Sequence, residues 1–142
     1  MPNRLFAGVL LLLLSRGVSA EWLFLKQGPE AAMFIEPTSL RILAGTSKVW
    51  TLIDFNKPQS RKDGKPFFSF MLQSEWDCKN ELTRSMYISQ HAGHMGQGNK
   101  LSGAATNEEW RPVSPGGPDA LFLSLICDPK VRAAAQEGIR LP

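Results

Sequence analysis

The sequence predicts an α+β domain: an antiparallel meander of five to seven strands, followed by one C-terminal helix that a disulfide fixes to a face of the sheet. Three observations lead to this prediction. Short apolar segments with a period near two recur from residue 21 to about residue 101, separated by turn residues. Near the C-terminus the apolar spacing changes to four residues. The chain has two cysteines, one in each of these parts.

The first 20 residues are predicted to be a cleavable secretory signal. Arg4 supplies a positive charge, residues 5–14 are an unbroken apolar run, and Val-Ser-Ala at 18–20 fits a cleavage site. This run is about half the length of a membrane-spanning helix, and no later segment is long enough, so we expect an exported protein that does not span the membrane. The signal carries no lipid-attachment cysteine. We therefore expect the protein in the periplasm, or secreted or at the cell surface.

The charge and composition of residues 21–142 favour an ordinary folded domain. Because Arg4 and Arg16 leave with the signal, 14 Lys and Arg balance 13 Asp and Glu, a net charge of +1 against +3 for the whole chain. Nucleic-acid-binding domains are normally far more basic, so no nucleic-acid partner is expected. Hydrophobic residues make up 43% of the chain and charged residues 20%, which argues against disorder.

The first half of the domain contains four predicted strands. Three are short and lie at residues 22–25, 32–35 and 39–43, with Gly28-Pro29 as a turn between the first two. The clearest strand covers residues 47–55. Val49, Ile53 and Phe55 lie on one of its faces and Trp50 and Leu52 on the other. Because both faces are largely apolar, we expect this strand to be central and covered on each side.

Residues 56–66 are predicted to be a long hairpin loop, since they include prolines and Asp63-Gly64. The loop carries four basic residues, Lys57, Arg61, Lys62 and Lys65, which we predict as ligand-binding residues. They could face an acidic polysaccharide, a lipid phosphate or an acidic segment of a host protein. The alternative is an ordinary soluble loop whose charges discourage aggregation.

The second half of the sheet begins with a predicted strand at residues 67–77. Its alternation places Trp76, and then Cys78, on the core side. Residues 81–89 alternate more weakly, 90–98 form a glycine-rich connection, and 99–101 are at most a short strand.

A helix is predicted from residue 118 to about Cys127. Pro118 suits the first helical position, and Phe122 and Ile126 lie four residues apart on an apolar stripe. Pro129 disfavours continuation. We therefore divide the chain into the signal (1–20), a domain (21–128) and a C-terminal tail (129–142) that is a frayed helix or disordered.

The two cysteines, Cys78 and Cys127, are predicted to form a disulfide, because paired thiols in an exported chain are usually oxidised. The bond would hold the last turn of the helix on the sheet. The alternative is a pair of free buried thiols.

Catalytic and cofactor chemistry has little support in the sequence. The only histidines, His91 and His94, lie in a glycine-rich segment beside Met95, a set that suits copper but has no third ligand nearby. Glu75 and Asp77 lie on one strand face, where edge charges are commoner than an acid–base pair. No nucleophile motif occurs. We therefore expect no enzyme activity, no catalytic residue, no cofactor and no metal.

A set of short motifs occurs in a fixed order along the chain and is followed by Cys127. The motifs are Val-Trp-Thr-Leu-Ile-Asp-Phe at 49–55, Glu-Trp-Asp-Cys at 75–78, Met-Gly-Gln-Gly at 95–98 and Trp-Arg-Pro-Val-Ser-Pro-Gly at 110–116. In this order and spacing they resemble the surface-adhesin protein E family of proteobacteria. The resemblance covers about residues 22–128. It implies about six antiparallel strands and a C-terminal helix tethered to the concave face by Cys78–Cys127. It also implies adhesion to host matrix and plasma glycoproteins through surfaces rather than a catalytic pocket.

Two functional hypotheses follow. The first is an exported, non-enzymatic binding module with a protein or glycoprotein ligand. The second is a periplasmic structural or accessory protein of the envelope that has no extracellular ligand. Strand edges and the two-sided apolar strand are also compatible with a homodimer.

Overall fold

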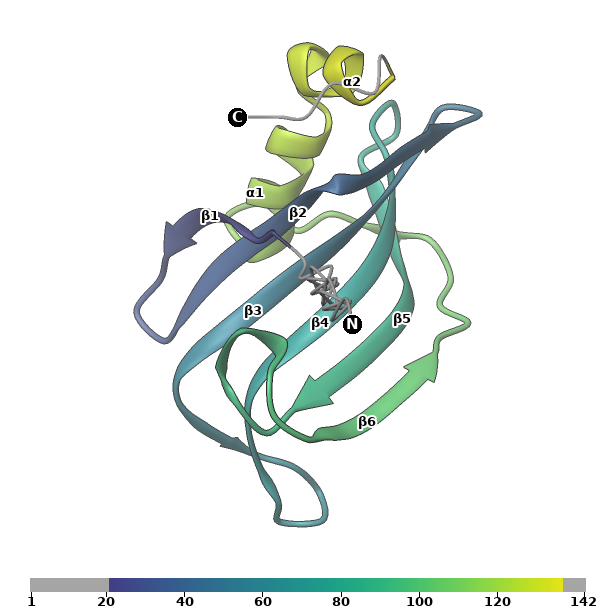
Figure 1. Cartoon of the computed structure of the whole chain (residues 1–142). Helices are drawn as coiled ribbons and strands as arrows, with labels where there is room; N and C mark the ends of the chain where they lie inside the picture. Colours follow the sequence, from purple (N-terminus) through teal and green to yellow (C-terminus); the bar gives the residue numbers. More distant parts are fainter. Residues whose placement is uncertain (1–20, 137–142) are drawn as a thin grey trace, which may run out of the picture.

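The computed structural model describes residues 21–136; the predicted signal and residues 137–142 lie outside them. Six strands form an antiparallel sheet in the order β1-β2-β3-β4-β5-β6, and a seventh strand, β7, pairs with β5. Their bounds are Leu23–Gln27 (β1), Ala31–Leu43 (β2), Thr46–Ser60 (β3), Pro66–Asp77 (β4), Leu82–His91 (β5), Lys100–Ala105 (β6) and Arg111–Pro112 (β7). Two helices follow, and Figure 1 shows both at the upper end of the sheet. The predicted α+β meander is confirmed.

The segments predicted as separate strands at 32–35 and 39–43 are one strand, β2. Pro37 lies between them, and the pairing with β3 shifts between Glu36 and Arg41. Proline has no N–H to donate to a neighbouring strand, so the pairing is interrupted although the chain stays extended. Ser39 bridges the gap, because its Oγ accepts a hydrogen bond from the Trp50 N–H at 2.9 Å.

The long hairpin loop predicted at residues 56–66 is largely strand. β3 continues to Ser60 and β4 begins at Pro66, so residues 61–65 alone form the turn. The prolines do not prevent this extension. Pro58 falls in a stretch of irregular pairing between β3 and β4, and Pro66 is the first residue of its strand. Both are positions where a missing N–H is tolerated.

The glycine-rich connection after β5 folds back over the sheet as a single 3-10 turn, η1 (His94–Gly96). Two side chains of the sheet hold it. Asp54 Oδ1 accepts a hydrogen bond from the Met95 N–H at 2.9 Å, and Ser69 Oγ accepts one from the Gly96 N–H at 2.9 Å. Gly96 has a φ of +70°, and an added Cβ would lie 2.8 Å from the side chain of Met71 in β4, so the position favours glycine. We name the side of the sheet that carries Asp54 and Ser69 the loop face.

The first helix, α1 (Pro118–Ile126), occupies the predicted segment. Pro129 ends it, as expected, but also begins a second helix, α2 (Pro129–Gln136). Proline is favoured at a first helical position, and the Oδ1 of the preceding Asp128 accepts a hydrogen bond from the Lys130 N–H at 2.8 Å. The first part of the expected tail is therefore an ordered helix. Neither helix is long and apolar enough to cross a membrane.

The core lies between α1 and the side of the sheet opposite the loop face, which we name the helix face. Val49, Trp76, Phe122 and Ile126 are at most 3% exposed and form its centre together with Ile35 and Leu40. Leu52, on the loop face of β3, is also fully buried. β3 is therefore covered on both faces along part of its length, as its apolar pattern indicates.

Candidate functional site

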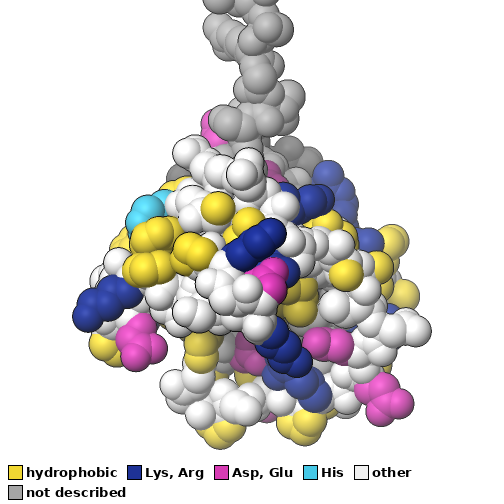
Figure 2. Space-filling model, turned by 90° about the horizontal axis from the view of Figure 1, so that it is seen from below, with side chains coloured by type: hydrophobic (Ala, Val, Ile, Leu, Met, Phe, Trp, Pro, Cys, Tyr) yellow, Lys and Arg dark blue, Asp and Glu magenta, His cyan; other side chains and the backbone are white. Residues whose placement is uncertain are grey.

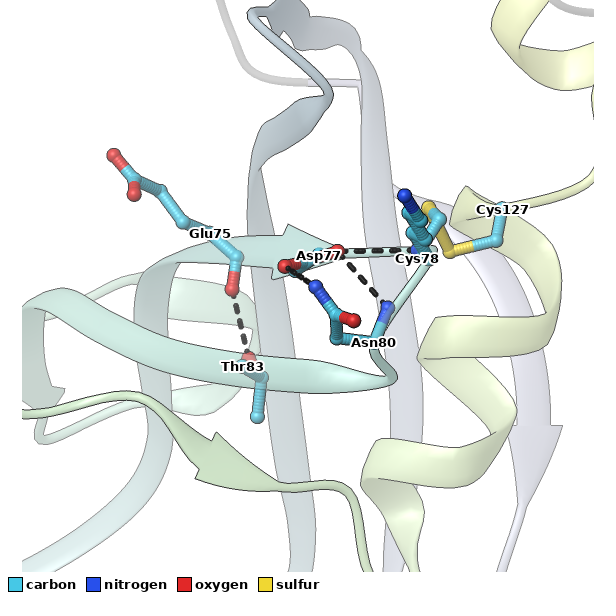
Figure 3. Close-up of a disulfide and its surroundings, with 7 residues drawn as sticks. Glu75, Asp77, Cys78, Asn80, Thr83 and Cys127 are labelled. Carbon is cyan, nitrogen blue, oxygen red and sulfur yellow. Dashed lines mark hydrogen bonds between the residues drawn. A yellow bond between two sulfur atoms is a disulfide. The ribbon is translucent and has the colours of Figure 1, made fainter.

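The disulfide joins the end of β4 to the end of α1. Cys78 and Cys127 are bonded, with their Cα atoms 5.6 Å apart, and neither thiol is free (Figure 3). Cys78 follows Trp76 by two residues, so the alternation of β4 directs it toward the helix face. The covalent bond therefore fixes α1 over the part of that face which surrounds Trp76.

Glu75 and Asp77 have structural partners. The Arg84 guanidinium binds Glu75 Oε2 at 2.8 Å. Asp77 accepts hydrogen bonds from the side-chain amide of Asn80 and from the backbone N–H groups of Asn80 and Lys79 (Figure 3). These bonds, above all the side-chain bond from Asn80, lower the pKa of Asp77. Both carboxylates therefore accept hydrogen bonds from other residues of the β4–β5 hairpin.

The two histidines have separate environments. His94 Nδ1 lies 3.1 Å from Asp54 Oδ1, and its ring packs on Phe68 with centroids 4.3 Å apart. His91 is buried, and its Nε2 lies 2.9 Å from Ser89 Oγ. Within residues 21–136, no group of three or more His, Cys, Asp or Glu side chains is placed to hold a metal ion.

The buried position of His91 has a consequence for stability. Burial lowers the pKa of His91, and the nearby positive charge of Lys100 lowers it further. The second ring nitrogen, Nδ1, is buried without a hydrogen-bond partner, so the site offers no carboxylate to stabilise an imidazolium.

We expect the free energy of unfolding to fall as the pH is lowered from 7.5 to 5. The folded-state pKa of His91 lies below the ordinary value of 6.5, so its contribution is complete above that pH and is lost as the pH falls through the folded value. Urea unfolding of the wild-type protein and of His91→Gln across this range tests the claim. His91→Gln should flatten the decline. An equal decline in both proteins would assign it to other groups.

The four predicted ligand-binding residues lie on the β3–β4 hairpin. Lys57, Lys62 and Lys65 have exposed side chains. Arg61 is less exposed, since its guanidinium binds Asp63 Oδ1 at 3.2 Å and Gln90 Oε1 at 3.1 Å. The structure thus presents three lysines to solvent and uses the arginine to hold the turn against β5. Figure 2, which views the molecule from the hairpin end, shows basic, acidic and hydrophobic side chains interspersed over this surface.

An apolar surface lies next to this hairpin, on the helix face. Its half-buried side chains are adjacent in the strand register, which pairs Ile53 with Met33 and Phe70, and Leu72 with Ile88. The ring of Phe55 packs on that of Phe70, with centroids 5.6 Å apart. We name this set the apolar half-face: Met33, Ile53, Phe55, Phe70, Leu72 and Ile88.

A groove connects the apolar half-face to the start of α1. It has a volume of about 300 Å³. Met33 and Ile53 line it from the sheet, and Pro118 and Leu121 line it from α1, with Lys26 and Glu30 from the region of the β1–β2 turn. Sequence reasoning did not identify this surface, because the strand alternation does not reveal which apolar positions α1 covers.

The aromatic side chains of the loop face are engaged with one another and with charged neighbours. Trp50 and Tyr87 pack edge to face, with ring centroids 5.7 Å apart. The Arg84 guanidinium, already bound to Glu75, stacks on Trp110 at 4.6 Å. These contacts provide partners for Trp50, Tyr87 and Trp110, whereas Phe24, on the same face at the β1 edge, is 55% exposed. We take the hairpin and the adjacent apolar half-face as the candidate binding surface, because exposed lysines lie there beside apolar side chains.

The family model for surface-adhesin protein E matches residues 22–128. The chain belongs to this family. The match ends one residue beyond Cys127 and includes every strand and α1. The resemblance carried by the sequence motifs is thus confirmed, and the protein is surface-adhesin-like.

Solved structures of Haemophilus influenzae protein E share the fold of this chain. One is 14% identical, with a TM-score of 0.56, and the match covers 78% of this chain and 86% of that one. The selenomethionine form is 12% identical, with a TM-score of 0.59 and coverages of 82% and 92%. A further structure, from non-typeable H. influenzae, is 14% identical, with a TM-score of 0.54 and coverages of 80% and 88%. No curated protein is significantly similar to this chain in sequence.

Proposed function

We propose that the chain is an exported, non-enzymatic binding module, in which residues 21–128 follow a cleaved signal and hold a protein or glycoprotein ligand. The observation that carries this proposal is the family match over nearly all of the described residues. The arrangement of the site supports it. The basic hairpin lies next to partly exposed apolar side chains, a combination that suits recognition of another macromolecule.

The polar clusters support binding rather than catalysis. Glu75 is paired with Arg84, Asp77 caps a turn, and Asp54 holds η1 on the sheet. Each of these carboxylates therefore has a structural role in the fold. Adhesion requires no reactive group, only a surface whose shape and charge match those of the ligand.

Charge reversal at the hairpin tests the proposal. The probe is an immobilised extracellular-matrix extract, and the variant is the triple change Lys57→Glu, Lys62→Glu and Lys65→Glu. We expect binding to weaken roughly tenfold, since exposed ion pairs contribute about 0.2–1 kcal/mol each. The remaining binding should depend less on salt, because fewer screened charges take part.

The control changes two exposed basic residues outside the hairpin, Lys79→Glu and Lys130→Glu. This variant should bind as the wild-type protein does. If the hairpin variant keeps full affinity and salt dependence, the hairpin has no part in ligand binding. If the wild-type protein binds no matrix or plasma glycoprotein at all, the proposed function is wrong.

A further inference from the structure

We infer that the apolar half-face accepts an amphipathic, acidic helix of the protein ligand, which lies beside α1 and reaches the basic hairpin. This inference rests on the proposed function and specifies the kind of segment that the binding module recognises. It is carried by three features of the described residues: the way in which α1 packs, the size of the uncovered apolar surface, and the charge at its border.

The packing of α1 shows that this face of the sheet accommodates a helix. Phe122 and Ile126, one helical turn apart, are 3% and 0% exposed and contact the core around Val49 and Trp76. An apolar pair at positions i and i+4 thus forms the buried centre of a helix on this face, together with the partly buried Leu123 and Leu125 and the disulfide. Figure 1 shows α1 and α2 at the upper end of the sheet and no described helix across the lower parts of β4, β5 and β6.

The uncovered surface has the size of one helix. The apolar half-face extends from β2 to β5. Neighbouring strands are separated by about 4.8 Å, so these four strands span roughly 14 Å, whereas a helix with its side chains is about 10–12 Å wide. The groove of about 300 Å³ against Leu121 gives apolar side chains of the incoming helix a place beside α1.

The charge at the border favours an acidic partner. The hairpin presents Lys57, Lys62 and Lys65 to solvent. The one carboxylate among them, Asp63, already accepts hydrogen bonds from Arg61 and from the Lys65 N–H. Carboxylates on the polar side of an incoming helix would meet these exposed ammonium groups. The mode is that of a helix laid into an apolar surface, with anchors at positions i, i+3, i+4 and i+7.

The helices of a second copy of this chain do not have the required chemistry. α2 contains two basic residues, Lys130 and Arg132, and no acidic one. The one acidic residue of α1, Asp119, is bound by Arg111 at 2.7 Å. These helices would bring positive charge or no free charge to a basic hairpin. The observations therefore favour a different, acidic partner.

Titration with synthetic peptides tests the inference. The probe is a peptide of about 18 residues with leucine at positions i, i+3, i+4 and i+7 and glutamate elsewhere; the matched control carries lysine in place of glutamate. The wild-type protein should bind the acidic peptide and bind the basic one at least about tenfold more weakly. Amide chemical shifts of the wild-type protein should change at Phe70, Leu72, Ile88 and Leu121. Shift changes confined to Trp50 and Tyr87, on the loop face, would overturn the inference.

Two single-residue variants test whether the acidic peptide binds at the apolar half-face. Ile88→Gln should weaken acidic-peptide binding at least about tenfold, as expected for loss of a central apolar anchor. Leu43→Gln changes a residue that is 73% exposed at the β2–β3 turn and should have no effect. Equal peptide binding by wild type and Ile88→Gln would overturn the inference. If instead Ile88→Gln does not fold, the shift changes of the wild-type protein decide.

Four further results bear on the occupant and on the proposed function. Sedimentation showing a wild-type dimer that Ile88→Gln dissociates would overturn the inference in favour of a second copy. Binding to phosphatidylglycerol vesicles without binding to the acidic peptide would overturn it in favour of a lipid. If the wild-type protein binds the matrix extract and Ile88→Gln binds it equally well, the inference fails while the proposed function stands. If the acidic peptide binds but no matrix protein does, the proposed function fails and the surface retains its helix-binding property.

Discussion

Replacing both cysteines, by Cys78→Ser with Cys127→Ser, is expected to lower the free energy of unfolding by roughly 4 kcal/mol. The disulfide closes a loop between residues that are 49 apart in the sequence, and a cross-link over a loop of this length removes about that much conformational freedom from the unfolded chain. Domains of this size usually have about 5–15 kcal/mol in total, so roughly a quarter or more of the stability would be lost.

Guanidinium unfolding of the wild-type protein, with and without a reducing agent, and of the double variant measures this effect. The reduced wild-type protein and the variant should agree, because both lack the same bond. A loss below about 1 kcal/mol would contradict the expectation. It would mean that the packing of α1, rather than the cross-link, already holds the helix on the sheet.

Trp76→Ala is expected to destabilise the protein by about 3–5 kcal/mol, the usual range for removing a large buried aromatic side chain. Trp76 is 2% exposed and packs on Phe122, with ring centroids 6.2 Å apart. It is the largest fully buried side chain between the sheet and α1. The cavity left by alanine would remove apolar contacts from both layers at once.

Two further variants test whether the lost volume of the Trp76 side chain, rather than its polar group, causes the destabilisation. The indole Nε1 of Trp76 is buried without a hydrogen-bond partner, so Trp76→Phe removes an unsatisfied group and should cost much less than Trp76→Ala. Trp110→Ala, at a partly exposed tryptophan, should cost about 1 kcal/mol or less. Equal losses in Trp76→Phe and Trp76→Ala, measured by urea unfolding, would contradict this account of the core.

The sequence predicts the fold well where one local rule acts alone. Pro118 marks the start of α1, and two cysteines allow a single pairing. The predictions were wrong where tertiary pairing overrides a local break. The predicted strands end at residues 35 and 55, shortly before Pro37 and Pro58, yet the neighbouring strands keep both proline segments extended. β6 reaches Ala105 although its small residues, Ser-Gly-Ala-Ala, show no alternation. Its partner β5 supplies the hydrogen bonds that define it.

The candidate site was only partly predictable, for a physical reason. The four basic residues of the hairpin follow from composition, but nothing local indicates that Arg61 reaches Gln90 on β5. The apolar half-face was missed because Ile53 and Val49 lie on the same face of β3 and look alike in sequence. Val49 is fully buried beneath α1, and Ile53 lines the groove beyond it. That difference depends on where the disulfide fixes the helix.

The proposed binding of an extracellular ligand requires the protein to reach the outside of the cell, and protease accessibility in cells tests this requirement most directly. Intact cells and osmotically shocked cells are treated with protease, and the mature protein is followed with an antibody. Digestion of a reduced lysate is the control, because the cross-linked domain could resist cleavage. We expect intact cells to lose the protein. Loss from shocked cells alone would place it in the periplasm and contradict the account, leaving an accessory protein of the envelope that shares the adhesin fold.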